Sequence, residues 1–225
     1  MARLSQCNAE SFYQGEAGRK YFSRFPSPRS DILSRCFTAK VGRWIVPEDR
    51  VFEYGVGSGR NLLPLAVAER AGYDVSEHAR TVAREAGLYI YDAIDRIPCQ
   101  HWSLVICHHV LEHVPSPLDT LQRLRELLSP QGKLILTVPL EGQARRVKQK
   151  NQDPDHHLYC WNPTTLRNLV ECAGFATRDI QVRIAAREDT FAPVAHYSWT
   201  AFNLLVWGTG MILHRGEVTV VAALE

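Results

Sequence analysis

The sequence lacks an apolar run long enough to cross a bilayer. Its most apolar segment, residues 199–213, is too short and is interrupted by Asn203, Gly208 and Gly210. The first ten residues are polar and contain no apolar core of a signal peptide. We therefore expect neither a transmembrane protein nor a secreted precursor.

Paired cysteines are also lacking. The six cysteines are scattered along the chain, and no two of them form a C-x-x-C pair. This spacing excludes a zinc knuckle and argues against a disulfide framework. A reducing cytoplasm is therefore the expected location.

The chain has little excess of charge of either sign. Its 26 Lys and Arg residues face 24 Asp and Glu residues, for a formal net charge of +2. Nothing global therefore favours nucleic acid or a membrane as a partner. A local basic run at residues 145–150 predicts either a solvated loop or a contact for a phosphate or carboxylate on a substrate.

What the sequence does contain is an alternation of short strands and helices. Its 225 residues, 45% of them hydrophobic, suffice for one sizeable core. Strands are expected at 51–54, just before Asp74, and at 88–91, 102–107, 133–138, 180–186 and 218–223, with helices at 61–66, 76–86, 117–128 and 164–173 and a turn at 130–132. The alternation predicts an α/β fold, doubly wound around a mostly parallel seven-stranded sheet with helices on both faces.

Two segments stand apart from this alternation. Residues 1–47 are expected to form an N-terminal helical cap on the main domain, residues 48–225. Residues 187–215 are rich in aromatic side chains and separate the last two strands. We interpret this insert as a lid or a substrate pocket; a dimer face and a contact with a membrane surface are the alternatives.

A glycine-rich turn follows the first predicted strand. The run Glu53-Tyr54-Gly55-Val56-Gly57-Ser58-Gly59 lets the backbone turn sharply and approach a ligand closely. The helix expected next would direct free N–H groups at that ligand. A dinucleotide fold requires G-x-G-x-x-G, but the residue three positions beyond Gly57 is Arg60. The observed spacing is therefore G-x-G-x-G, preceded by an acid.

This turn resembles the first motif of the class I S-adenosylmethionine-dependent methyltransferases of the small-molecule type. Similar family segments are Val110 to Val114, Leu128 to Lys133 and Glu171 to Phe175, so that the resemblance covers about residues 48 to 184. It implies S-adenosylmethionine as the cofactor, covered by the N-terminal helices. The implied cofactor-binding residues are Glu53, Gly55, Gly57 and Gly59 at the turn, Asp74 and Val75 at the ribose, Asp92 and Ala93 at the adenine, and His108.

Histidines gather after the fourth predicted strand. The run from His109 to His113 matches the inverted zinc-protease signature H-x-x-E-H. Pro115, however, disfavours the helix which that chemistry requires. The run also resembles the E-x-x-E-H metal site of ubiquinone-pathway O-methyltransferases and small-RNA 2′-O-methyltransferases, with His109 replacing the first acid. Whether a divalent metal binds at His109, Glu112 and His113 stays open at this point.

Without a metal, the neutral histidines are candidate general bases, because histidine titrates near neutral pH. The catalytic candidates are His109, His113 and His157. No D/N-P-P-Y/F run follows the fourth strand and no Pro-Cys pair follows the fifth. These absences argue against methylation of DNA amino groups and of cytosine carbon.

The sequence thus predicts transfer of a methyl group from S-adenosylmethionine to an O or N atom of a small molecule. The alternatives are a metal-dependent RNA 2′-O-methyltransferase, an NAD(P)-dependent oxidoreductase and a non-catalytic scaffold with the methyltransferase fold. A small-molecule substrate is the expected partner, nucleic acid is not, and a homodimer is one assembly consistent with the insert.

Overall fold

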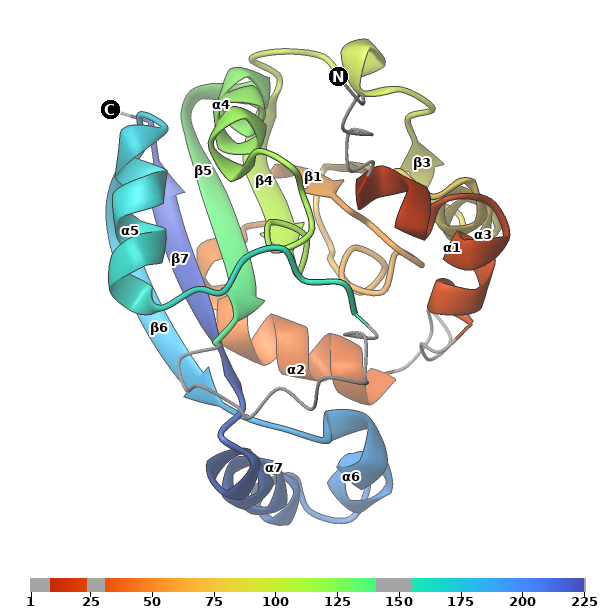
Figure 1. Cartoon of the computed structure of the whole chain (residues 1–225), viewed down its shortest axis with the longest axis vertical. Coiled ribbons are helices and arrows are strands. Elements are labelled where there is room, and N and C mark those ends of the chain that lie inside the picture. The colour runs from red at the N-terminus through yellow and green to blue at the C-terminus, as the bar shows by residue number, and fades with distance from the viewer. Residues whose placement is uncertain (1–8, 24–30, 141–154, 225) are drawn as a thin grey trace, which may run out of the picture.

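The computed structural model describes residues 9–23, 31–140 and 155–224. Its centre is a seven-stranded sheet in the order β3-β2-β1-β4-β5-β7-β6 (Figure 1). The strands are β1 (Arg50–Tyr54), β2 (Glu69–Tyr73), β3 (Tyr89–Ile90), β4 (Trp102–His108), β5 (Leu128–Pro139), β6 (Ala176–Ile184) and β7 (Gly216–Ala223). The first five pair in parallel, whereas β7 runs antiparallel to both β5 and β6. The expected mostly parallel α/β sheet is confirmed.

Helices cover both faces of this sheet. They are α1 (Gly15–Phe22), α2 (Asp31–Val41), α3 (Glu77–Glu85), α4 (Pro117–Leu127), α5 (Pro163–Cys172), α6 (Glu188–Ala195) and α7 (Trp199–Leu213). Side chains alternate along each strand. Val105 and Cys107 of β4 therefore lie in the cluster with α4 and α5, while Leu104 and Ile106 lie in the cluster with α2 and α3.

Two helix starts follow their sequence signals closely. The Ser76 side chain accepts a hydrogen bond from Ala79 N and caps α3. Asn162 caps α5 through a capping box with Thr165, and Pro163 occupies the first turn. Gly174 follows α5 with a φ of +86°, as a helix C-terminus favours.

The helix expected at residues 61–66 is absent, and this prediction was wrong. The segment forms successive turns, although a parallel β1–β2 pair is usually joined through a helix. Pro64 lacks the N–H that a helix would use. The Arg70 guanidinium instead satisfies the carbonyls of Leu62, Leu63 and Leu65. No helix N-terminus therefore points at a ligand from this segment.

The turn expected at residues 130–132 lies inside β5. Gln131 has a φ of +65°, and the pairing of β4 with β5 shifts in register between Trp102 and Leu104. The strand therefore passes through an irregularity instead of starting after a turn.

The antiparallel direction of β7 matters for the site. Because Pro139 at the end of β5 pairs with Glu217 near the start of β7, Glu217 lies at the edge where the parallel strands end. It arrives there directly from the insert. In Figure 1 the insert helices α6 and α7 form one end of the molecule.

Among the described helices, none has the length and apolarity to cross a membrane. No disulfide joins the cysteines within the described residues. The basic run at 145–150 lies outside the described residues.

Candidate functional site

The glycine-rich turn lies between β1 and β2 and is held by the end of β2. The N–H groups of Gly55 and Val56 donate to the carbonyl of Tyr73 at 2.8 and 3.0 Å. Gly55, Gly57 and Gly59 all have positive φ values, of +77°, +53° and +82°. Glycine adopts this conformation without the strain that a side chain would add.

Only one of these three glycines faces open space. A Cβ at Gly55 would lie 2.1 Å from Val110, and one at Gly59 would lie 2.3 Å from Leu88, so packing excludes both. A Cβ at Gly57 would meet nothing nearer than the Phe22 ring at 3.8 Å. Gly57 is therefore where a ligand can approach the backbone of the turn, and this opening fits the implied cofactor.

Asp74 lies directly after β2 and beside Gly57. One of its carboxylate oxygens accepts from Gly57 N and the other from Ser76 N, both at 2.9 Å. Burial raises the pKa of Asp74 to about 6, although these two hydrogen bonds lower it. Each oxygen keeps a second lone pair, so the carboxylate fits the ribose-binding role, which stays a prediction.

Glu53 is buried at the end of β1 beneath the turn. Its Oε1 accepts from Asn61 Nδ2 at 2.6 Å, whereas Glu53 Oε2 and Asn61 Oδ1 are buried without a hydrogen-bond partner among the described residues. Burial raises the pKa of Glu53 to about 8. These two buried oxygens lack partners among the described residues, so a polar group of a ligand could pair with them.

The other predicted cofactor residues are more exposed or engaged elsewhere. Asp92 is exposed and pairs with Arg84 at 2.5 Å. The Val75 carbonyl accepts from Arg80, and Ala93 begins a short 3-10 turn. The His108 ring faces α2, where Lys40 Nζ lies 3.0 Å from its Nε2. Cofactor binding by these residues stays a prediction.

The histidines that follow β4 converge on Glu112. The Glu112 side chain is fully buried, with His109 Nδ1 at 3.4 Å and His113 Nε2 at 3.6 Å from its Oε1. The rings of His113 and His157 lie 4.9 Å apart. The backbone N–H of Leu158 donates to the Glu112 carbonyl at 2.8 Å, which holds His157 in place.

These residues form turns and no helix, as expected from Pro115, so the zinc-protease interpretation fails on geometry. His109 has a φ of +55°, a conformation uncommon outside glycine. Its backbone N–H donates to the Thr137 carbonyl at 2.8 Å, which fixes the sharp turn after β4.

Tyr13, from the N-terminal segment, fixes the tautomer of His113. The hydroxyl donates to the Asp155 carbonyl at 2.9 Å and lies 2.7 Å from His113 Nδ1. Because its one hydrogen goes to Asp155, the oxygen accepts from Nδ1–H of the ring. This arrangement favours the tautomer in which Nε2, 3.6 Å from Glu112 Oε1, is unprotonated. Burial lowers the pKa of His113, so the ring is neutral.

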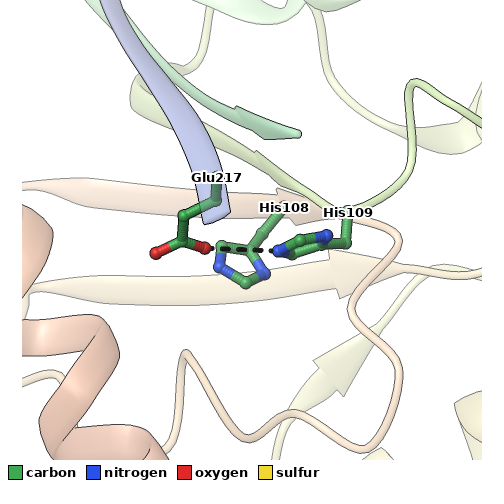
Figure 2. Close-up of side chains that lie close together, drawn as sticks. All are labelled: His108, His109 and Glu217. Carbon is green, nitrogen blue, oxygen red and sulfur yellow. Dashed lines mark hydrogen bonds and ion pairs between the residues drawn. The ribbon is translucent and has the colours of Figure 1, made fainter. Parts of the chain in front are cut away.

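His109 is held differently, by two carboxylates. Glu217 Oε2 lies 3.3 Å from its Nε2, as Figure 2 shows, while Glu112 lies on the Nδ1 side. Burial alone would lower the pKa of His109, but the two carboxylates raise it to about 9. His109 is therefore a cation at neutral pH and not a proton acceptor. Of the three candidate bases, His113 is the one whose pKa is lowered by burial.

Among the described residues, two groups of side chains have the donor atoms of a metal site. Ligand atoms of Glu112, His113 and His157 lie within 4.8 Å of one another, as do those of His108, His109 and Glu217. In the second group the Lys40 ammonium occupies the place of a metal ion, because its Nζ lies 2.9 Å from Glu217 Oε1 and 3.0 Å from His108 Nε2. That group does not fit a metal.

The first group does fit. The buried Glu112 carboxylate has only the long contact of 3.4 Å with His109 Nδ1, and neither of its oxygens accepts a well-formed hydrogen bond among the described residues, which is rare for a buried carboxylate. One carboxylate with two imidazoles is a donor set that divalent transition ions accept. Ligands around a four-coordinate zinc lie about 3.3 Å apart, so binding would need the three side chains to close in.

Two residues of this site carried no signal as site members in the sequence. Lys40 and Glu217 come from α2 and β7, far along the chain from the histidine run. No motif marks them. Only the antiparallel pairing of β7 and the packing of α2 reveal them.

Comparison with known proteins gives a family. The model of a family described as a methyltransferase domain matches residues 19–180. The ubiquinone biosynthesis O-methyltransferase of Aromatoleum aromaticum is 32% identical over 100 residues, which cover 39% of this chain and 43% of the relative. The match thus spans less than half the length of that relative.

Solved structures share the fold at low identity. Phosphoethanolamine N-methyltransferase 2 of Haemonchus contortus, crystallised with phosphomonomethylethanolamine and S-adenosylhomocysteine, superposes with a TM-score of 0.63 at 18% identity, covering 89% of this chain and 54% of that one. The cyclase SpnF gives 0.61 at 19% identity, covering 85% and 81%. These likenesses show the fold alone.

Proposed function

The chain belongs to the methyltransferase-domain family and uses S-adenosylmethionine, and we propose that it transfers the methyl group to an O or N atom of a small molecule. A hydroxyl oxygen is the favoured acceptor atom, since the relative from Aromatoleum aromaticum is an O-methyltransferase. The observation that carries the proposal is the meeting of two half-sites at one edge of the sheet. Gly57 with Asp74 forms the first, and the histidine cluster forms the second.

The cofactor, when bound, supplies an electrophilic methyl group on a positive sulfonium. The open face of Gly57 would admit it to the turn, and Asp74 would accept hydrogen bonds from its ribose. Nε2 of the neutral His113 takes the proton of the acceptor, while Tyr13 holds the ring in that tautomer. Alignment of the acceptor and exclusion of water do the rest.

The first test is calorimetric titration with S-adenosylhomocysteine, with NAD and NADP as controls. We expect S-adenosylhomocysteine to bind tightly and neither nicotinamide to bind. Asp74→Asn should weaken the binding of S-adenosylhomocysteine at least about tenfold, because hydrogen bonds to a charged group are lost. The exposed variant Asp95→Asn is the matched control. Preference for a nicotinamide, or absence of binding, would overturn the proposal.

Transfer of a labelled methyl group then identifies the acceptor. A panel of phenols and catechols is compared with a panel of amines. Labelling of phenols that is lost in His113→Ala supports an oxygen acceptor and a basic His113. Labelling of amines alone would refute the choice of oxygen.

A metal-assisted version of this reaction is favoured by the unsatisfied carboxylate of Glu112. Glu112, His113 and His157 would hold a divalent ion, which would supply a Lewis acid that lowers the pKa of an acceptor hydroxyl. Thermal unfolding with Zn²⁺, Mg²⁺ or Mn²⁺ tests it. An increase in Tm that His157→Ala abolishes and the exposed variant His196→Ala retains supports the site; no increase with any ion contradicts it.

A nicotinamide oxidoreductase gains no support, because family membership and the G-x-G-x-G turn both argue against it. RNA 2′-O-methylation would require RNA to be protected and methylated in the same assay. A scaffold without activity would bind S-adenosylhomocysteine yet label no acceptor.

A further inference from the structure

The insert presents an apolar surface that the fold does not cover. Helix α7 spans fifteen residues without one charged side chain. One side packs Phe202 and Val206 into a small core with α2 and α6. The other side exposes five large apolar side chains: Leu204 (63%), Leu205 (42%), Trp207 (55%), Met211 (50%) and Ile212 (79%).

These side chains form one continuous patch. Positions three and four apart lie on the same side of a helix, so Leu204, Gly208 and Ile212 form a row. Nothing lies within 4 Å of a Cβ built on Gly208, which keeps the middle of the row open. The patch measures on the order of 500 Å², larger than the singly scattered apolar residues of an ordinary surface. A patch of this size is often a functional surface.

Basic side chains lie at both ends of α7. At the N-terminal end the exposed Arg35 stacks its guanidinium on Trp199 at 3.9 Å. At the C-terminal end His214 and Arg215 are exposed. Asp189, at the start of α6, is the exposed acid of the insert, since Glu188 pairs with Arg183.

We propose that α7 docks this protein on the surface of an anionic lipid bilayer. The apolar row enters the boundary between headgroups and acyl chains, and Arg35 and Arg215 meet lipid phosphates. Trp207, with an apolar ring and a polar N–H, suits that boundary. The two insert helices also form one end of the molecule, so a flat surface can reach them (Figure 1).

A second copy of the chain fits the patch less well. A stable interface buries about 800 Å² per partner, more than this patch offers. Antiparallel packing of two copies of α7 would place Arg35 of one copy against Arg215 of the other. Parallel packing would place each arginine against its own equivalent. Both arrangements oppose like charges, whereas lipid phosphates are complementary at both ends.

Docking in this way would bring the active edge of the sheet toward lipid. β7 begins at Gly216, shortly after α7 ends at Leu213, and Glu217 reaches the histidine cluster. The proposal concerns where the protein works and holds for any methyl acceptor. Its failure would leave the proposed methyl transfer untouched.

Cosedimentation with vesicles tests the proposal. The full chain is mixed with vesicles of phosphatidylcholine and phosphatidylglycerol, and separately with phosphatidylcholine alone. We expect binding to the mixed vesicles and about tenfold weaker binding to the neutral ones, since each arginine adds attraction to anionic lipid. Leu204→Ser/Ile212→Ser should weaken binding by about tenfold or more. Val46→Ser, which changes an exposed apolar side chain elsewhere, should bind like wild type.

Titration with S-adenosylhomocysteine shows that each variant is folded. Failure of the wild type to bind mixed vesicles overturns the proposal, and so does equal binding by the double variant. A concentration-dependent dimer in analytical ultracentrifugation that the double variant abolishes, with no vesicle binding, would also overturn it and assign the patch to self-association.

Discussion

The buried ion pair between Lys40 and Glu217 should contribute measurably to folding. Its atoms lie 2.9 Å apart, with side chains only 7% and 12% exposed. At that distance the attraction is about 6 kcal/mol for an effective dielectric constant near 20. Desolvation of the two ions offsets several kcal/mol of this in the net stability that the pair contributes. A double-mutant cycle cancels the desolvation of each ion and reports the pairwise interaction, which we expect to be about 3 kcal/mol, the upper end for residues in contact.

The cycle uses Lys40→Met, Glu217→Gln and the double variant, each unfolded with urea. Lys40→Met alone should lower the free energy of unfolding by about 3 kcal/mol, because it leaves the Glu217 carboxylate buried with less compensation. Arg183 Nη1, 3.5 Å from Glu217, and His109 limit that loss. The double variant should lose less than the sum of the single variants.

Arg167 and Glu171 provide the matched control. They pair at 2.8 Å on α5, but their side chains are 57% and 42% exposed. An exposed pair at this helical spacing contributes at most about 0.5 kcal/mol. A coupling energy for Lys40 and Glu217 no larger than that of the control would refute the reasoning, because burial would then add nothing.

The pH dependence gives the same test a second readout. Burial alone would raise the pKa of Glu217, but Lys40 and the neighbouring histidines hold it well below its usual value. A carboxyl with a depressed folded-state pKa stabilises the fold above its unfolded pKa, near 4.5, and that stabilisation is lost as the pH falls further. The stability difference between wild type and Glu217→Gln should therefore shrink below about pH 4.

Three further predictions concern the two half-sites. Gly57→Ala should weaken binding of S-adenosylhomocysteine more than it lowers the free energy of unfolding. Gly59→Ala should lower the free energy of unfolding by at least about 2 kcal/mol, because the added methyl group clashes with the core. If Gly57→Ala were the more destabilising variant and Gly59→Ala the one that weakens binding, the assignment of the open face would be contradicted. Because the pKa of Glu53 is raised to about 8, wild type should lose roughly 3 kcal/mol between pH 5 and 8 that Glu53→Gln keeps, and equal urea profiles would argue against a buried carboxyl. Tyr13→Phe should lower kcat for methyl transfer about tenfold with little change in KM, since His113 loses its tautomer-fixing partner, and an unchanged kcat would remove His113 from the base role.

Local signals in the sequence predicted most of the sheet. Strands such as β4 and β5 are apolar runs bounded by polar residues, and Ser76 and Asn162 cap helices where expected. The helix at 61–66 failed because its carbonyls found a side-chain partner in Arg70. Arg70 lies outside the segment, on β2, so the apolar spacing within residues 61–66 could not predict that its side chain would bind these carbonyls.

The positions of Gly57 and Asp74, side by side where their strands end, could be predicted because they depend on local sequence. Each of these residues follows a predicted strand, and parallel strands end at one edge. The protonation states could not be predicted. His109 and His113 are four residues apart, yet one is a cation between two carboxylates and the other is neutral beside a tyrosine. Their partners come from distant parts of the chain.

Tyr13, Glu217 and the insert lie outside the segment that the family model matches. That segment starts at residue 19 and ends at residue 180. The cofactor half-site lies inside it. If acceptor choice depends on the histidine cluster, its determinants are Tyr13 and Glu217, which set the tautomer and the charge of those rings. Exchange of these two residues, with the glycine turn untouched, should therefore change which acceptor is methylated while binding of S-adenosylhomocysteine stays the same.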